Sequence, residues 1–252
     1  MYREFKKSLG QNFLVDSHFI QMIFERIHID QNSELLEIGP GDGKLTQELI
    51  KLEIPLKLIE LDQKLIDILQ KKFGENKLVE ITEGDILKID FNAISNSNLI
   101  FLGNLPYNIS SQIILRLLES NSNFKYAIFL IQKELAERFI PQEKKSTKIS
   151  LQAKFFADIE PLFNIPPTAF QPIPKVTSTL VKIVPHSNKY DFKKYEALKE
   201  ILTVCFSEPR KQLVNPMKKL FSELPEFSFK LTSRAEDLAL DDYFEILSKY
   251  EQ

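Results

Sequence analysis

The 252-residue sequence contains very little of several residue types, and each scarcity excludes a class of protein. The single cysteine, Cys205, rules out a framework of internal disulfides and fits a reducing compartment. Three histidines beside that one cysteine argue against a structural zinc site. No apolar run approaches the length of a membrane span, and the first nine residues are polar and basic. We therefore expect a cytoplasmic protein without a metal and without a membrane segment.

The chain also lacks an excess of charge of either sign, because 33 basic and 35 acidic side chains give a formal net charge of −2. This balance excludes a protein that coats nucleic acid by bulk positive charge, so any such contact must come from local basic patches. Hydrophobic residues make up 43% of the chain and charged residues 27%, as in ordinary globular proteins. A chain of this length can bury one good core and carry a small second domain.

Glycine is the third scarce residue, with only seven in the chain. In so poor a composition, glycines are expected where the backbone needs a positive φ or where another group approaches closely. Gly39, Gly41 and Gly43 stand together, while Gly84 and Gly103 each follow an apolar segment. The distribution indicates that these glycines mark the functional ends of strands.

Apolar segments that alternate with amphipathic ones dominate the rest of the sequence. Strands are predicted at 35–38, 56–61, 78–82, 99–103 and 126–131, and helices after Asp16 or Ser17, after the glycine segment to Lys51, after residue 62, and at 111–118 and 133–139. Such alternation is typical of right-handed βαβ units, so we predict an α/β fold with a Rossmann-like, mostly parallel sheet. Residues 177–184 alternate like an edge or antiparallel strand.

The pattern changes after Pro185. Helical periodicity without strands follows at 195–206, from Pro209 onward and at 241–248. We therefore predict two domains, an α/β domain over residues 1–185 and a small all-α domain over residues 186–252. Neither contains a repeat or a low-complexity segment.

Three polar features follow successive predicted strands. The segment Glu37-Ile38-Gly39-Pro40-Gly41-Asp42-Gly43 follows the first strand and opens a helix, so that backbone N–H groups can approach a ligand. Glu60 ends the next strand, where a carboxylate can accept hydrogen bonds from ribose hydroxyls. Asp85 follows a third strand and can accept from an adenine amino group, although Gly-Asp is also a common turn.

Together these features predict a nucleotide-type cofactor, because ligands of open α/β sheets bind at the carboxyl ends of the strands. The glycine segment and Glu60 alone suit a nicotinamide, a flavin or S-adenosylmethionine equally. They are also compatible with a tight turn that binds nothing.

The segment Gly103-Asn104-Leu105-Pro106-Tyr107-Asn108 ends the fourth strand and narrows the choice. An exocyclic adenine amine is a poor nucleophile because its lone pair is delocalised into the ring. The amide oxygen of Asn104 and the carbonyl of Leu105 can accept its N–H bonds and favour a pyramidal nitrogen whose lone pair faces a methyl donor. Pro106 stiffens the turn, and Tyr107 offers a ring on which a flipped base can stack. We therefore predict methyl transfer to an adenine amine rather than a proline-containing turn with a buried tyrosine.

With these motifs the chain resembles the ribosomal RNA adenine dimethyltransferases, and within them the small-subunit (16S) enzymes. The matching segments are 7–14, 37–46, 59–62, 84–86, 103–110, 170–176 and 234–238, which together span nearly the whole chain. The resemblance implies that S-adenosylmethionine is bound by Asn12, Leu14, Gly39, Glu60, Asp85 and Asn104, with Gln11, Gly41 and Ile86 close by. It also implies that two methyl groups are added to each of two adjacent adenosines near the 3′ end of 16S rRNA, in an immature small ribosomal subunit.

The RNA-binding residues are less well defined by the sequence. Segment 170–176 resembles the family's target-binding motif, which makes Phe170 a candidate contact to the target base. Between Glu208 and Glu223, the candidate RNA contacts Arg210, Lys211, Lys218 and Lys219 occur with no acid among them. Such runs are otherwise ordinary solvated surface. We expect the protein to act as a monomer.

Two segments depart from the family pattern. Residues 146–150 lack the usual Tyr-Gly, and residues 208–211 lack the usual consecutive arginines. Pro216 also interrupts the helix expected there. We therefore expect RNA recognition to differ from the family more than the chemistry does.

Three other functions fit parts of the pattern. A large-subunit rRNA methyltransferase of the antibiotic-resistance type shares the fold and cofactor, but Leu9-Gly10 and Leu105 favour the small-subunit branch. An assembly or transcription factor would use the same fold only for binding, and intact Asn104 and Tyr107 argue against that. A dehydrogenase is disfavoured because Asn-Leu-Pro-Tyr has no rationale in hydride transfer.

Overall fold

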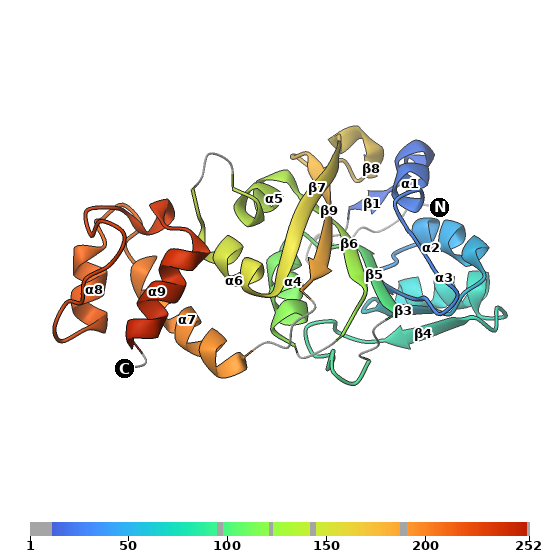
Figure 1. Ribbon diagram of the computed structural model, residues 1–252. Coiled ribbons are helices and arrows are strands. Elements are labelled where there is room, and N and C mark those ends of the chain that lie inside the picture. Colours follow the sequence, from blue (N-terminus) through green and yellow to red (C-terminus); the bar gives the residue numbers. More distant parts are fainter. Residues whose placement is uncertain (1–11, 95–97, 121–122, 142–144, 187–190, 251–252) are drawn as a thin grey trace. The chain divides into compact units, whose positions relative to one another are not determined.

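The computed structural model describes residues 12–94, 98–120, 123–141, 145–186 and 191–250 (Figure 1). The chain divides into two compact units, the first formed by Met1–Ala136 with Glu160–Pro185 and the second by Glu137–Ile159 with His186–Gln252. The second unit therefore differs from the predicted domain of residues 186–252, because it also contains residues 137–159.

The first unit is built on a seven-stranded sheet with the order β4-β3-β2-β5-β6-β9-β7. The strands are β2 (Glu34–Ile38), β3 (Leu56–Glu60), β4 (Val79–Glu83), β5 (Leu99–Asn104), β6 (Tyr126–Gln132), β7 (Ala157–Ile165) and β9 (Ser178–Pro185). Strands β2 to β6 pair in parallel, and β9 pairs antiparallel with β6. The predicted α/β fold with a mostly parallel sheet is confirmed.

Helices flank this sheet, and two of them begin at aspartate caps. They are α1 (Ser17–Phe24), α2 (Lys44–Leu49) with the 3-10 turn η2 (Ile50–Leu52), α3 (Gln63–Phe73), α4 (Ser110–Glu119) and α5 (Lys133–Phe139). Asp16 caps α1 by accepting a hydrogen bond from the His18 N–H, and Asp62 caps α3 in the same way from Lys64. These helices follow the strands in the order that the alternating pattern predicts.

The central strands are buried at consecutive positions rather than at alternate ones. Leu35 and Leu36 of β2 and Ile100, Phe101 and Leu102 of β5 are each 0% exposed. Parallel strands covered on both faces have this pattern, since neither face meets water. The core of the first unit therefore lies directly beneath the carboxyl ends of the strands, where it supports whatever binds there.

Strand β7 and helix α6 (Lys148–Phe156) were not predicted from the sequence. Pro161 lies inside β7 and would be incompatible with a central strand, but β7 is at the edge of the sheet, where a missing N–H is tolerated. Helix α6 begins with a capping box in which Thr147 and Ser150 exchange hydrogen bonds. The segment 146–150, which departs from the family pattern, therefore forms a regular start to this helix.

A two-stranded sheet joins two distant segments of the first unit. Strand β1 (Phe13–Leu14) pairs antiparallel with β8 (Phe170–Gln171), with Phe13 opposite Gln171 and Leu14 opposite Phe170. Residues 167–169 form a 3-10 turn immediately before β8. The pairing places the segment after β8 next to the start of the described chain.

The second unit is helical apart from the beginning of β7. Its elements are α6, α7 (Phe192–Cys205), α8 (Val214–Leu220), the 3-10 turn η4 (Ala235–Asp237) and α9 (Leu240–Tyr250). Leu198, Ile201, Met217 and Tyr243 are each 0% exposed within one shared hydrophobic cluster. Pro216 lies in the first turn of α8, where a missing N–H costs little, so the helix begins there and is not interrupted. Within the described parts of the chain, no helix is long and apolar enough to cross a membrane.

Candidate cofactor and target-base site

A cavity of 290 Å³ lies at the carboxyl ends of the parallel strands of the first unit. Most of the residues predicted as the site line it: Asn12, Leu14, Gly39, Gly41, Glu60, Asp85, Ile86, Asn104, Leu105, Pro106 and Tyr107. Gln11, also predicted for the cofactor site, lies outside the described residues. The structure thus brings together residues from β1 and from the ends of β2, β3, β4 and β5.

The glycine turn after β2 is shaped by close approach. Gly39 and Gly41 have φ values of 63° and 61°, which side chains rarely adopt. A Cβ atom on Gly41 would lie 2.8 Å from the ring of Phe13, whereas one on Gly39 would have no atom within 4 Å. Phe13 therefore covers the turn at Gly41, whereas Gly39 leaves room for a ligand.

Glu60 holds this turn in place. Its Oε2 accepts a hydrogen bond from the Gly41 N–H at 3.2 Å, and its Oε1 accepts from the N–H groups of Leu61 and Asp62 at 2.9 and 3.0 Å. Burial raises the pKa of this carboxyl, and the three N–H donors act against that rise. A carboxylate has about four acceptor positions, so three donors leave one for a ligand.

Glu37 is a second buried carboxyl beside the cavity, only 2% exposed. The Thr46 hydroxyl donates to its Oε2 at 2.6 Å. Burial raises the pKa of Glu37 to about 7, and the nearby negative charges of Glu60 and Asp42 act in the same direction. In the sequence, this residue stood out only as part of the glycine segment.

Asp85 lines the cavity at the end of β4 and also closes the turn that follows it. Its Oδ1 accepts a hydrogen bond from the Leu87 N–H at 3.0 Å, while Oδ2 lies 3.9 Å from the Lys88 Nζ. The side chain is 29% exposed, which leaves it accessible to a ligand's amino group.

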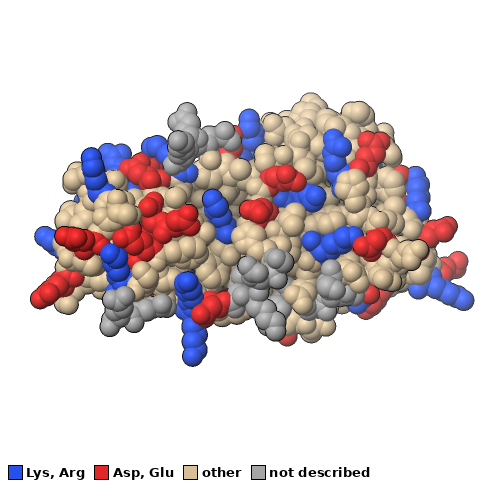
Figure 2. Space-filling model, viewed as in Figure 1, with Lys and Arg blue, Asp and Glu red and all other residues tan. Residues whose placement is uncertain are grey.

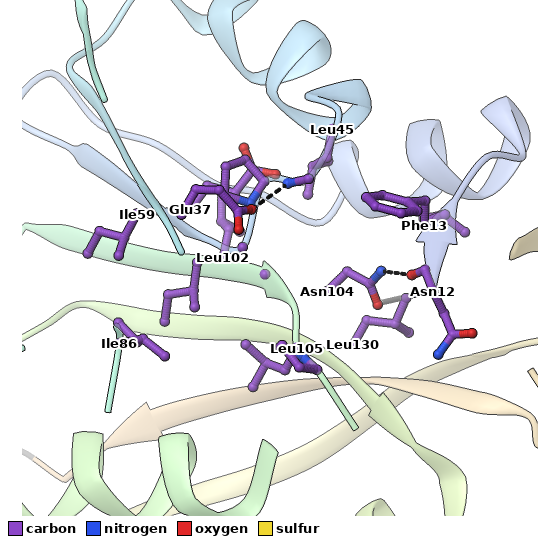
Figure 3. A pocket seen from close by; sticks show the side chains of 18 of the residues that line it. Asn12, Phe13, Glu37, Leu45, Ile59, Ile86, Leu102, Asn104, Leu105 and Leu130 are labelled. Atoms are coloured by element: carbon purple, nitrogen blue, oxygen red, sulfur yellow. Dashed lines mark hydrogen bonds between the residues drawn. The ribbon is translucent and has the colours of Figure 1, made fainter. Parts of the chain in front are cut away.

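Asn104 is oriented by a contact across the site (Figure 3). Its Nδ2 donates to the backbone oxygen of Asn12 at 2.6 Å. A carbonyl oxygen can only accept, so this bond fixes which end of the amide faces Asn12. The Oδ1 of Asn104 is therefore turned away from Asn12 and keeps its capacity to accept.

Tyr107 is half-buried, and its hydroxyl is held in place. The hydroxyl groups of Tyr107 and Ser178 form a hydrogen bond of 2.6 Å, and burial raises the pKa of the tyrosine. The turn that contains it is closed by the Pro106 oxygen, which accepts hydrogen bonds from Ile109 N and from Ser110 Oγ. Tyr107 is thereby held through both its side chain and its backbone turn.

Phe170, which the sequence suggested as a contact to the target base, lies inside the first unit in this structure. Phe170 is 2% exposed and belongs to the hydrophobic core of the first unit. In the short strand β8 successive side chains face opposite sides, so Phe170 points inward while Gln171 is exposed. A base has no free face of this ring on which to stack.

The four basic residues after Glu208 are also less free than the sequence indicates. Glu208 forms ion pairs with Lys211 and with Lys219, the second at 3.7 Å. These pairs lower the pKa of Glu208. Arg210 and Lys218 are exposed and form no ion pair with the residues that the structure describes. No acidic residue lies between these basic residues in the sequence, but in the folded chain Glu208 neutralises two of them.

Several lining or supporting residues were missed by the sequence analysis. Phe13 packs over the glycine turn, and Leu61, 50% exposed, lines the cavity directly after Glu60. Leu61 could have been predicted from the sequence, because it is an apolar residue directly after Glu60 at the end of a strand. Ser178 lies 71 residues from Tyr107, and no local pattern could have paired them.

The fold of the chain is shared with two solved methyltransferase structures. Among solved structures, the chain is similar to a dimethyladenosine transferase from Plasmodium falciparum, with a TM-score of 0.78 and 24% identity over 95% of this chain and 97% of that one. It is also similar to the 23S rRNA methyltransferase ErmE, with a TM-score of 0.70 and 20% identity over 95% of this chain and 100% of that one. At these identities the similarity establishes the fold alone.

The family follows from the sequence comparisons. The profile of the ribosomal RNA adenine dimethylase family matches residues 2–252, and the chain belongs to this family. Ribosomal RNA small subunit methyltransferase A of Pelagibacter ubique is 36% identical over 100% of this chain and 98% of its own. The protein of that name from Pseudomonas fluorescens is 38% identical over 86% of this chain and 82% of its own. Family and fold imply S-adenosylmethionine as the methyl donor and rRNA as the substrate class.

Proposed function

We propose that the protein dimethylates the N6 amines of two adjacent adenosines near the 3′ end of 16S rRNA, in an immature small ribosomal subunit. It acts as a monomer in the cytoplasm. The observation that carries the proposal is the orientation of Asn104, whose amide oxygen is kept free by the bond from its nitrogen to Asn12. The names of the similar proteins favour the small subunit over the large one.

The residues that line the cavity suit S-adenosylmethionine. The open space above Gly39 accommodates a ligand against the backbone, and Asn12, Leu14 and Gly41 line the same region. The remaining acceptor position of Glu60 suits a ribose hydroxyl. Asp85, with Ile86 beside it, suits the adenine amino group of the cofactor, and Gln11 is assigned to the same site from the family resemblance.

The chain's part in catalysis is positioning, with little need for acid–base help. When held by Asn12, Gly39, Glu60 and Asp85, S-adenosylmethionine would supply an electrophilic methyl group for the N6 amine. The Oδ1 of Asn104 and the carbonyl of Leu105 hold the amine by accepting its N–H bonds. The half-buried ring of Tyr107 supports the extruded base.

Incubation of immature small subunits with labelled S-adenosylmethionine, followed by nucleoside mapping, tests the proposal. We expect N6,N6-dimethyladenosine at two adjacent positions near the 3′ end of 16S rRNA. Label in 23S rRNA, or subunits that stay unlabelled although the protein binds the cofactor, would overturn it. The second result would instead favour a factor that acts only by binding.

A further inference from the structure

The loop between β8 and β9 displays an apolar side chain to solvent. Among the large apolar residues that the structure describes, Ile173 is the most exposed, at 68%, and Val176 in the same loop is 40% exposed. Single exposed apolar residues are common on protein surfaces and need no explanation by themselves. Ile173 differs from such residues because its backbone is rigid and its loop lies next to the candidate site.

The loop is stiff and anchored at both ends. Pro172 and Pro174 fix φ on either side of Ile173. Before them, Gln171 pairs with Phe13 in the two-stranded sheet, and after them the Thr177 oxygen accepts from the Lys133 N–H at 3.0 Å. Ile173 is therefore presented in a fixed place, without the entropy of a flexible loop to lose on binding.

Both ends of the loop contact residues that line the candidate site. Phe13, opposite Gln171, lines the cavity beside Asn12, which orients Asn104. Ser178, directly after the loop, holds the hydroxyl of Tyr107. A base that reaches Asn104 and Tyr107 must have left its stack, and this loop begins and ends beside the residues that contact these two.

The charge next to Ile173 suits nucleic acid. Lys175 is exposed and, among the residues that the structure describes, has no acidic partner. An apolar side chain that enters between bases, next to a cation that meets a phosphate, is a common device of proteins that unstack nucleic acid. An apolar protein partner would gain nothing from the unpaired lysine.

We propose that Ile173 is a wedge that fills the space left in the rRNA base stack when the target adenine is extruded, with Lys175 on a neighbouring phosphate. Ile173 is thus a positioning residue that acts through the RNA and does not touch the reacting atoms. This inference rests on the proposed function and names the RNA segment beside the target adenine as the partner of the loop.

The test uses the full-length protein and small subunits assembled with 16S rRNA that carries 2-aminopurine next to the target adenine. Ile173→Ser removes the apolar side chain. Ile173→Val is a separate variant that keeps most of that side chain. Val184→Ser is the matched control, because Val184 is 38% exposed at the opposite end of β9. Cofactor affinity and thermal melting should be the same for all three variants.

We expect the 2-aminopurine fluorescence change seen on binding of the wild type to be lost in Ile173→Ser, and kcat on unmodified subunits to fall about tenfold or more, since unstacking a base is costly. Ile173→Val and Val184→Ser should resemble the wild type. Lys175→Gln should lower the salt slope of subunit binding by somewhat under one unit.

A raised KM with unchanged kcat and an unchanged fluorescence signal would show a docking contact and overturn the wedge. Full activity of Ile173→Ser in this purified system would likewise overturn the wedge proposal. The exposed loop would then be explained by binding of another protein. If wild-type protein does not methylate the subunits at all, the proposed function fails instead, so the two failures are distinguishable.

Discussion

The amide group of Asn104 shows how one hydrogen bond assigns a role to a residue. Without the 2.6 Å bond to the Asn12 oxygen, the amide could present either its donor or its acceptor to a substrate. With it, the acceptor is directed away from Asn12 and toward the remainder of the site. The sequence motif identified the residue, and the contact across the site explains why the orientation is fixed.

Asn104→Ala should lower single-turnover methylation of small subunits by about 10²–10³, as for loss of one preorganised polar group at a reacting centre. The fold should persist, because the substitution deletes little volume. Thermal melting and cofactor titration provide the controls. A folded Asn104→Ala protein that methylates at nearly the wild-type rate would mean that the amine is held elsewhere.

Glu60→Ala should weaken S-adenosylmethionine binding roughly tenfold or more, corresponding to about 1–3 kcal/mol. The substitution removes the acceptor for the ribose and also the three backbone bonds that hold the glycine turn. Glu83→Ala is the matched control, since Glu83 lies opposite Glu60 in the neighbouring strand but is exposed and does not line the cavity. Equal calorimetric affinities for the two variants would refute the assignment.

Tyr107→Phe and Tyr107→Ala should differ in kind. The first keeps the ring but leaves the fully buried Ser178 hydroxyl without its partner, so unfolding should become easier by about 0.5–1.5 kcal/mol with little loss of rate. The second should weaken retention of the base through lost stacking, by about 1–3 kcal/mol. Urea unfolding and single-turnover assays separate the effects. Adding Ser178→Ala to Tyr107→Phe should recover stability. If it does not, the hydrogen bond between Tyr107 and Ser178 does not contribute to the free energy of unfolding.

Between elements, the bond from Thr46 to Glu37 ties α2 to the end of β2. The pKa of Glu37 in the folded protein is raised to about 7 from its ordinary 4.5. Between these two values the folded state keeps a proton that the unfolded chain has released. The free energy of unfolding must therefore fall as the pH rises through this window and then level off.

Glu37→Gln removes this titration while keeping an oxygen that can accept from Thr46. We expect the variant to gain stability relative to the wild type between about pH 5 and 7, by on the order of 3 kcal/mol in total. Urea unfolding at several pH values measures the difference, with Glu83→Gln as an exposed control. A difference that does not change with pH would contradict the prediction.

The elements that the sequence predicted are those with strong local patterns. The buried parallel strands are continuous apolar runs, and α1 and α3 have capping aspartates, so each can be recognised without knowing its neighbours. Strand β7 has a mostly exposed or half-buried surface and a proline, which only its edge position makes acceptable. The burial of Phe170 depends on pairing with Leu14, more than 150 residues earlier, and such pairings leave no local signal.

Over the whole molecule, basic and acidic side chains are nearly equal in number, 33 against 35. Figure 2 shows Lys and Arg next to Asp and Glu across the face in view, in keeping with the balanced composition. RNA binding must therefore depend on a few cations that lack nearby acids. In the second unit Arg210 and Lys218 meet this condition better than Lys211 and Lys219, which Glu208 engages.

Arg210→Gln with Lys218→Gln should flatten the salt dependence of RNA binding by somewhat under one unit of slope for each lost contact. Glu208→Gln should have the opposite effect, because it releases Lys211 and Lys219. Cofactor affinity should not change in either variant. If salt titrations give the same slope for the wild type, the double variant and Glu208→Gln, these residues do not contact RNA.

The assignment of residues 137–159 to the second unit means that the two units are not consecutive along the chain. During synthesis, α6 leaves the ribosome before the helices that bury its Leu151, while the first unit still awaits β9. The second unit therefore cannot finish folding until long after its first residues are made, and the first unit is complete only at Pro185. A chain cut at residue 185 would retain α6 without its core partners, so the second unit cannot be removed or exchanged as a simple C-terminal module.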